Sequence, residues 1–328
     1  MLEDVLLFLL GLGLVIGGAD RVTVGATAIA RRLRVSALVI GVTVVALGSS
    51  APDLFVCVTS TLRHKPELAL GDVVGANIFD ILAAVGGVAL VRPLAVGADL
   101  RRTDMPLLVL SCVALFVCGD DSLFDGTGSE NVIDRSEGLL LLCLFVVFMT
   151  YTLRSARKAA QTGGDGGSDK PVEARPMAVW KAGAWLVAGF AALALGGNWV
   201  VDGSTALAER FGLSEGIVGL TIVALGSAAP DLATSLMAAW RGETGLALGN
   251  VVGACIFNVF FIIGLCATIE PLASGSITAV SYGTLVAGSV LLWVFATVFT
   301  KGRLTRLEGG LLVAAYFGYI VFLAVCRM

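Results

Sequence analysis

The sequence is poor in charge. Charged residues make up 14% of the 328 positions, whereas a soluble globular domain carries roughly 25%. The only histidine, His64, lies in a short polar stretch where we expect a surface position. No basic stripe runs along the chain, so the sequence predicts no nucleic-acid partner. An ordinary soluble domain is therefore excluded.

The cysteines form no framework. The chain has seven of them, and nearly all fall inside apolar runs with neither the spacing of a zinc site nor that of a disulfide scaffold. We expect them to be buried thiols that behave as small hydrophobic residues. The first apolar run also lacks the basic start of a secretory signal, because its first charges are Glu3 and Asp4. We therefore interpret that run as the first membrane helix.

What the sequence has in abundance is long apolar runs. Hydrophobic residues make up 57% of the chain and the mean hydropathy is +0.92. A run of about 20 apolar residues matches the hydrocarbon core of a bilayer when it is helical. The sequence predicts an all-α membrane protein with ten transmembrane helices. The expected segments are 4–30, 36–62, 67–91, 104–119, 136–153, 178–208, 214–240, 244–269, 277–299 and 307–326.

One connection divides the chain into halves. Residues 154–177 are rich in Gly, Ser and charge, which is typical of a flexible linker. They separate a first five-helix unit, 1–153, from a second, 178–328. If the N-terminus is outside, 16 basic residues fall on the inner side and five on the outer side. The basic residues thus favour a plasma-membrane protein with both termini outside and the linker in the cytoplasm.

The two halves share a repeat. When the chain is shifted by 178 positions, residues 41–86 align without a gap on residues 219–264, and 23 of the 46 pairs are identical. The shared skeleton is G-x-T-x-VALGS-x-APDL, an arginine, LALG-x-VVGA-x-IF and a final glycine. Five predicted segments separate the copies, so the second copy should enter the membrane from the opposite side. An inverted repeat of this kind is the architecture of many secondary transporters.

Each copy places a proline beside an aspartate inside an apolar run. Pro52 precedes Asp53, and Pro230 precedes Asp231. Proline interrupts a helix, so we expect helices 2 and 7 to be broken. The freed carbonyls, from about Ala46 and Ala224 onward, should then point toward the two carboxylates. An ionised aspartate at the membrane centre costs about 2.5–3.5 kcal/mol, so a purely structural role for both is disfavoured. Carbonyl and carboxylate oxygens are the ligands that a hard cation prefers.

A second matched pair follows. Asp80 ends GDVVGANIFD at 71–80, and Asn258 ends the matching GNVVGACIFN. An acid and an amide on facing helices could complete a site built around Asp53 and Asp231, although Asn258 could equally serve only as an interhelical hydrogen-bonding group. Asp72 and Asn250, which follow glycine near the segment borders, are interpreted as helix caps.

These motifs resemble the two alpha repeats of the cation/calcium exchanger superfamily, whose usual signature is G-T-S-x-P-E followed by G-N-x-x-G-S-N-x-F-N/D. The resemblance covers nearly the whole chain. It implies an antiporter that extrudes Ca²⁺, with inorganic cations as its substrates, the lipid bilayer as its surroundings and no separate cofactor. Asp53 and Asp231 stand at the acidic positions that bind the ion. The further ligands that it implies are Asp80, Asn258, Ser49, Ser227, Ser50 and the carbonyls of Ala46 and Ala224.

The chain departs from this signature in four respects. Both acids are aspartate rather than the more frequent glutamate, and serine replaces the threonine. The acid and amide of the second element stand in the reverse order from many prokaryotic members. Hydroxyls of the kind associated with sodium sites are replaced at Ala76, Ala228 and Ala254. Exchange of Ca²⁺ for Na⁺ is the leading hypothesis, and exchange for H⁺ is the alternative.

Two other classes of protein compete with an exchanger. An intramembrane aspartyl protease also uses two membrane aspartates, but its motifs differ from a duplicated Pro-Asp. A channel would share the interrupted helices, and the inverted repeat favours a transporter over it. Counterflow separates the three, because an exchanger needs an ion on the opposite side, a channel does not, and a protease moves nothing.

Overall fold

The computed structural model describes residues 2–32, 50–121, 131–161, 179–241, 244–299 and 302–327, and almost all of them are helical. The first half contains α1 (Leu2–Arg32), α4 (Ala51–Leu62), α5 (Pro66–Ile78), η2 (Phe79–Ala84), α6 (Val85–Val91), η3 (Leu100–Asp104), α7 (Met105–Gly119) and α9 (Arg135–Gln161). The second half contains α10 (Val179–Phe211), α11 (Glu215–Val218), η4 (Gly219–Val223), α12 (Ala224–Arg241), α13 (Thr244–Phe257), η5 (Asn258–Ile263), α14 (Gly264–Ile269), α15 (Ala279–Val294), η6 (Phe295–Phe299) and α16 (Arg306–Arg327). The segments labelled η are π-helical turns.

The membrane-spanning segments agree with the expected class. Within the described residues, nine helices are long and apolar enough to cross a bilayer. Helix α4 forms the second part of the expected span 36–62. Residues 36–49 of that span lie outside the described residues. The helix expected to end at 153 runs on to Gln161 as α9, so the first eight residues of the expected linker are helical. The rest of that linker lies outside the described residues.

The elements of the two halves repeat with the spacing of the sequence repeat. The series α5, η2, α6 and β1 (Leu94–Ala95) corresponds to α13, η5, α14 and β3 (Leu272–Ala273). Two short antiparallel ribbons join the halves: β1 pairs with β4 (Arg303–Leu304), and β3 pairs with β2 (Val132–Ile133). The helix contacts are exchanged in the same way, since α6 packs on α16 and α14 packs on α9. The halves are therefore interlocked, while their opposite insertion into the membrane stays a prediction.

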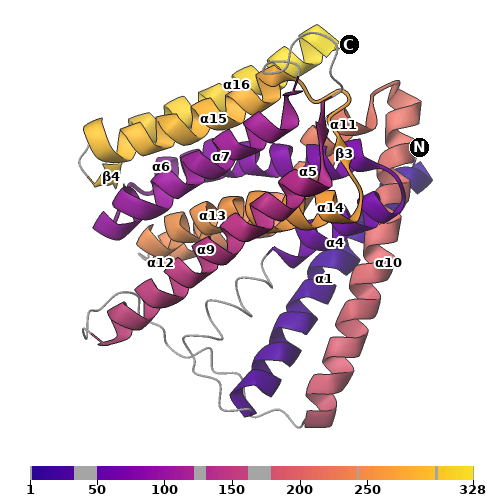
Figure 1. Ribbon diagram of the computed structural model, residues 1–328, viewed down its shortest axis with the longest axis horizontal. Helices are drawn as coiled ribbons and strands as arrows, with labels where there is room; N and C mark the ends of the chain where they lie inside the picture. Colours follow the sequence, from indigo (N-terminus) through magenta and orange to yellow (C-terminus); the bar gives the residue numbers. More distant parts are fainter. Residues whose placement is uncertain are drawn as a thin grey trace.

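Helices α1 and α10 lie side by side along much of their length, at one edge of the molecule (Figure 1). Glycine makes this close approach possible. A Cβ added to Gly11 would lie 2.9 Å from the carbonyl oxygen of Gly196, and one added to Gly196 would lie 2.7 Å from that of Gly11. The pair is also tied to the α4–α5 turn, which carries α4 and α5 into the centre of the molecule.

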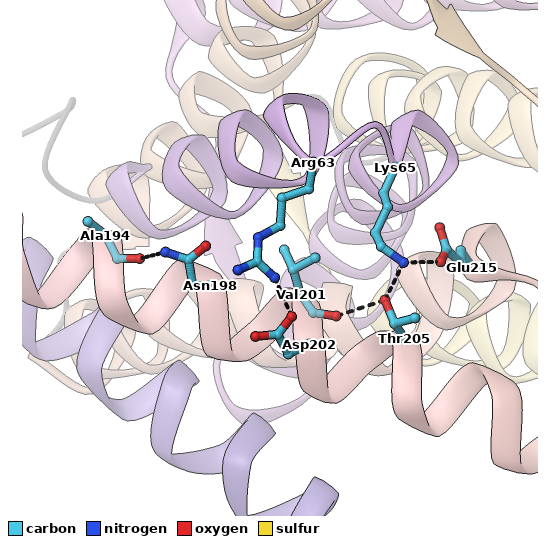
Figure 2. A network of polar contacts seen from close by, with 8 residues as sticks. All are labelled: Arg63, Lys65, Ala194, Asn198, Val201, Asp202, Thr205 and Glu215. Carbon is cyan, nitrogen blue, oxygen red and sulfur yellow. Dashed lines mark hydrogen bonds and ion pairs between the residues drawn. The ribbon is translucent and has the colours of Figure 1, made fainter.

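Figure 2 shows how that turn is held. Arg63 forms an ion pair with Asp202 of α10. Lys65 pairs with Glu215 at the start of α11 and donates to the hydroxyl oxygen of Thr205 at 2.7 Å. The charge of Asp202 is therefore balanced by a basic residue of a neighbouring turn.

The prolines act differently from one another. Pro52 stands in the first turn of α4, behind the N-cap residue Ser50, where its missing N–H has no intrahelical acceptor to lose. The expected break at Pro230 is wrong, because α12 continues through that residue. The irregularity of this span is instead the π-helical turn η4, which ends at Val223. Since proline has no N–H, the carbonyl of Gly226 lacks its usual backbone donor four residues on, but the helix as a whole is kept.

Candidate functional site

A buried hydrogen bond joins two of the predicted site residues, one from each half of the chain. Asp53 lies in the first turn of α4, and Asn258 begins η5. The amide of Asn258 donates to Oδ2 of Asp53 at 2.9 Å and contacts Oδ1 of Asn77 at 3.2 Å. Asp53 is 2% exposed and both asparagines are fully buried. An amide dipole thus faces one oxygen of the carboxylate, while Oδ1 of Asp53 has no hydrogen-bond partner.

The corresponding pair in the other half is chemically different. We call two residues mates when the 178-residue shift aligns them. The mate of Asp53 is Asp231 and the mate of Asn258 is Asp80, so a carboxylate replaces the amide in the other half. Asp80 interacts electrostatically with Asp231 and also with Asp53. Both oxygens of Asp80 are buried without a hydrogen-bond partner. Two buried carboxylates without a donor between them repel each other, and a cation or a proton between them would relieve that repulsion.

The two copies of the motif meet at Asn77. Its side-chain amide donates to the carbonyl oxygen of Cys255 at 3.1 Å. Under the 178-residue shift, Cys255 is the residue that matches Asn77. The two copies of the motif are therefore in direct contact at this position, beside the amide of Asn258.

Both α5 and α13 widen into a π-helical turn next to the site. The turn η2 includes Asp80 as its second residue, and η5 begins at Asn258. A π turn adds a residue to the helical repeat and frequently marks a functional position. Neither turn contains proline, so nothing in the local sequence signalled it.

The remaining predicted ligands have mixed outcomes. Ser50 is buried as the N-cap of α4, and its carbonyl oxygen accepts a hydrogen bond from Leu54 at 3.0 Å. Ser227 is buried, but its hydroxyl donates to Asp72 at 2.8 Å. The carbonyl oxygen of Ala224 is the more distant partner of that hydroxyl, at 3.4 Å. Ser49 and Ala46 lie outside the described residues.

Sequence analysis missed part of this centre. Asp72 and Asn250 are not helix caps, because each lies inside its helix, α5 and α13. Asp72 accepts from Ser227 and from the thiol of Cys57, the latter at 3.5 Å, and Asn250 lies 3.5 Å from Oδ1 of Asp231. The signal that could have found them is the repeat itself, since an acid in the first copy stands opposite an amide in the second at this position too.

A second repeated contact supports the same frame. The thiol of Cys57 donates to the carbonyl oxygen of Ala69 at 3.4 Å, and the hydroxyl of Ser235 donates to that of Ala247 at 3.3 Å. These two pairs are related by the 178-residue shift. The helices that carry Asp53 and Asp231 are thus fastened to α5 and α13 in the same way in both halves.

The arrangement can bind cations only through a mixed set of oxygens. Among the described residues, no three His, Cys, Asp or Glu side chains converge closely enough to hold a metal ion by themselves. Carboxylates, amides, hydroxyls and carbonyls do occur together here, and hard cations are bound by such oxygens. The chemistry available is therefore reversible ion binding inside a span, where ionisable residues mark substrate and ion pathways.

Comparison with known proteins decides the family. The sequence model described as sodium/calcium exchanger protein matches residues 4–154 and 181–325. The chain belongs to the sodium/calcium exchanger family. It is therefore an integral, multi-pass membrane protein of an antiporter family that transports cations.

Individual relatives match over their full length. The exchanger is 36% identical over 328 residues to the protein CaxA of Alkalimonas amylolytica, covering 97% of this chain and 98% of that one. It is 33% identical to the inner membrane protein YrbG of Escherichia coli, over 99% of this chain and 97% of that one. The solved structure of the sodium-calcium exchanger NCX_Mj, soaked with Na⁺ and Sr²⁺, matches with a TM-score of 0.63 and 29% identity over 99% of both chains.

The family assignment also selects among the competing classes. The intramembrane-protease alternative is overturned, because the family transports cations. The fold resembles that of NCX_Mj, with a TM-score of 0.62. The ion that the exchanger moves against its main substrate is a separate question.

Proposed function

We propose that this exchanger exports Ca²⁺ in exchange for Na⁺, by alternating access around a central site of Asp53, Asp231 and Asp80. The observation that carries the proposal is the chemical difference between two buried pairs of side chains. One pair is carboxylate and amide, Asp53 with Asn258, and the other is carboxylate and carboxylate, Asp231 with Asp80. The excess negative charge on the second pair favours a divalent cation there.

Relatedness supports the identity of the ions. The solved exchanger NCX_Mj is described as a sodium-calcium exchanger, and MaX1 of Methanosarcina acetivorans is named a sodium/calcium exchanger. MaX1 is 28% identical over 97% of this chain. The proposal takes the two substrates from these relatives and assigns their binding to the residues above.

Coupling to H⁺ is the second candidate. The buried alanines Ala76, Ala228 and Ala254 offer no oxygen from their side chains, and Na⁺ bound with too few ligands is not repaid for its lost hydration. A proton needs fewer partners, and the unpartnered oxygens of Asp80 could accept one. This alternative keeps the same site and changes only the counter-ion.

The orientation belongs to the proposal as well. The basic residues favour a plasma membrane with both termini outside and a cytoplasmic linker at 154–177. In that orientation the ion-paired turn of Arg63 and Lys65 lies on the outer side.

The test is uptake of radioactive ⁴⁵Ca²⁺ into proteoliposomes that hold the purified exchanger. Uptake driven by an opposing Na⁺ gradient, with the pH equal on both sides, is the expected result. Uptake only under a pH gradient would replace Na⁺ by H⁺ as the counter-ion. Uptake without any ion on the opposite side would identify a channel and end the proposal. Asp104→Asn provides the control, since it removes an acidic charge from a membrane helix outside the site.

A further inference from the structure

Asp72 is a fourth buried carboxylate beside the site. It is fully buried in α5, inside the membrane span Pro66–Val91. None of the ion pairs found within the described residues neutralises it. An ionisable group held at membrane depth without a basic partner is costly, so its retention suggests a function.

Close backbone packing holds Asp72 at the junction of the halves. The neighbouring residue Gly71 faces α11. A Cβ added to Gly71 would lie 2.6 Å from the carbonyl oxygen of Gly216. One turn further along α5, a Cβ on Gly75 would lie 2.4 Å from the carbonyl oxygen of Leu220. Only glycine allows this approach, and it brings Asp72 within reach of Ser227 on α12.

The hydroxyl of Ser227 connects Asp72 with Asp53. A serine hydroxyl has one hydrogen, and here it points to Oδ1 of Asp72 at 2.8 Å. Asp53 and Asp72 interact electrostatically, and Oδ1 of Asp53 is buried with no partner. The hydroxyl of Ser227 also interacts with the carboxylate of Asp53, so its oxygen lies between the two acids. A cation there would meet acceptors only.

The other half provides a built-in comparison. At the matching position Asn250 approaches Oδ1 of Asp231 at 3.5 Å, so a neutral amide faces the second site acid. The sequence signature of the family also has asparagine at this place in the first copy. At this position the first half of the chain therefore carries a negative charge that the second half lacks.

We propose that Asp72, Ser227 and Oδ1 of Asp53 bind the monovalent counter-ion of the exchange cycle, a site distinct from the Asp80–Asp231 pair. The inference rests on the proposed exchange of Ca²⁺ for a monovalent metal ion. Asp72 contributes charge that compensates for hydroxyls missing at Ala228 and Ala254. The amide of Asn258 stabilises the charge of Asp53 through Oδ2, so Asp72 supplies the remaining uncompensated charge here, and one monovalent cation balances it.

Equilibrium binding of ²²Na⁺ to the purified exchanger tests the site directly. We expect Asp72→Asn to raise the Na⁺ dissociation constant at least about tenfold, because a charged contact is replaced by a neutral one. Binding of ⁴⁵Ca²⁺ should change less than about twofold, and Asp104→Asn should change neither. A wild type that binds no Na⁺, or an equal loss of both ions in Asp72→Asn, overturns the inference.

Transport separates this inference from the proposed function. Ca²⁺/Ca²⁺ counterflow in Na⁺-free vesicles should persist in Asp72→Asn, while Na⁺-driven uptake needs a higher Na⁺ concentration. Loss of counterflow in the wild type would contradict the exchanger itself, whatever the result of Na⁺ binding. If only the pH dependence of uptake changes in Asp72→Asn, Asp72 holds a proton and the assignment to a monovalent metal ion is wrong.

A conservative variant covers the case in which Asp72→Asn fails to fold. Asp72→Glu keeps the charge but lengthens the side chain by one methylene. It should alter the Na⁺ dissociation constant while Ca²⁺ binding stays within about twofold. Unchanged binding of Na⁺ in a folded Asp72→Glu, together with a misfolded Asp72→Asn, would assign Asp72 a structural role only.

Discussion

Asn77 donates its side-chain amide to the carbonyl oxygen of Cys255 at 3.1 Å, and the two residues occupy the same position in the two copies of one motif. This contact joins the two halves directly. The same repeat matches Asp53 with Asp231 and Asp80 with Asn258. The predictions below use that relationship.

Removing either primary acid should abolish Ca²⁺ transport. We expect Asp53→Asn and Asp231→Asn each to lower ⁴⁵Ca²⁺ uptake by at least about a hundredfold, since each removes a charged ligand from a buried site. Both side chains keep their shape, so the purified variants should elute like the wild type in size-exclusion chromatography. Wild-type flux in either variant would refute the central claim.

Exchanging the acid and the amide should preserve more activity than removing the acid. Asp80→Asn alone leaves Asp53 and Asp231 each paired with an amide and no longer with an acid, and uptake should fall at least about tenfold. Adding Asn258→Asp returns the lost charge to the mirrored position, beside Asp53. The double variant should recover uptake to within a few fold of the wild type. The idea fails if the double variant is no better than Asp80→Asn.

Binding of Ca²⁺ should weaken as the pH falls. Asp53, Asp80 and Asp231 are buried close enough to interact, so protons compete with Ca²⁺ for the carboxylates of the proposed Ca²⁺ site. Lowering the pH from about 8 to about 5.5 should raise the Ca²⁺ dissociation constant, with more than one proton taken up for each Ca²⁺ released. Equilibrium ⁴⁵Ca²⁺ binding at fixed ionic strength measures this, and a flat profile over that range would contradict it.

Restoring the missing hydroxyls should strengthen Na⁺ coupling. The triple variant Ala76→Ser, Ala228→Ser and Ala254→Ser adds neutral oxygens at three buried positions. We expect the Na⁺ concentration for half-maximal uptake to fall by several fold, because Na⁺ regains ligands that replace its hydration. Saturable, pH-independent Na⁺ coupling that is already present in the wild type and unaltered in the triple variant would show that these hydroxyls are unimportant.

The orientation can be tested by cysteine labelling. In a cysteine-free background, single cysteines at Arg154 and at Gly163 should react with an impermeant maleimide only after the cells are opened. A cysteine in place of Arg63 should react in intact cells and provides the matched control. Arg63 lies in the turn after α4, which the proposed orientation places on the outer side. Labelling of the Gly163 position in intact cells would reverse the proposed topology.

The sequence alone predicted a membrane protein, because a helix that crosses the hydrocarbon core of a bilayer must be long and apolar. Each span needs about 20 apolar residues, so the runs themselves predicted helices such as α7 and α15, and the structure confirms them. The duplicated motif likewise pointed to Asp53 and Asp231 without any coordinates. A charge repeated at matched positions inside apolar runs is too costly to be incidental.

Only the tertiary structure decided which groups each carboxylate meets. The contact from Asn258 to Asp53 spans 205 positions and that from Ser227 to Asp72 spans 155, so no local pattern could reveal them. The glycine before Asp72 suggested a helix border, yet Gly71 packs closely on Gly216 and Asp72 is fully buried inside α5. Pro230 likewise suggested a break from its local chemistry, whereas α12 continues through it. Local sequence states what a residue prefers, and packing between distant segments determines whether that preference prevails.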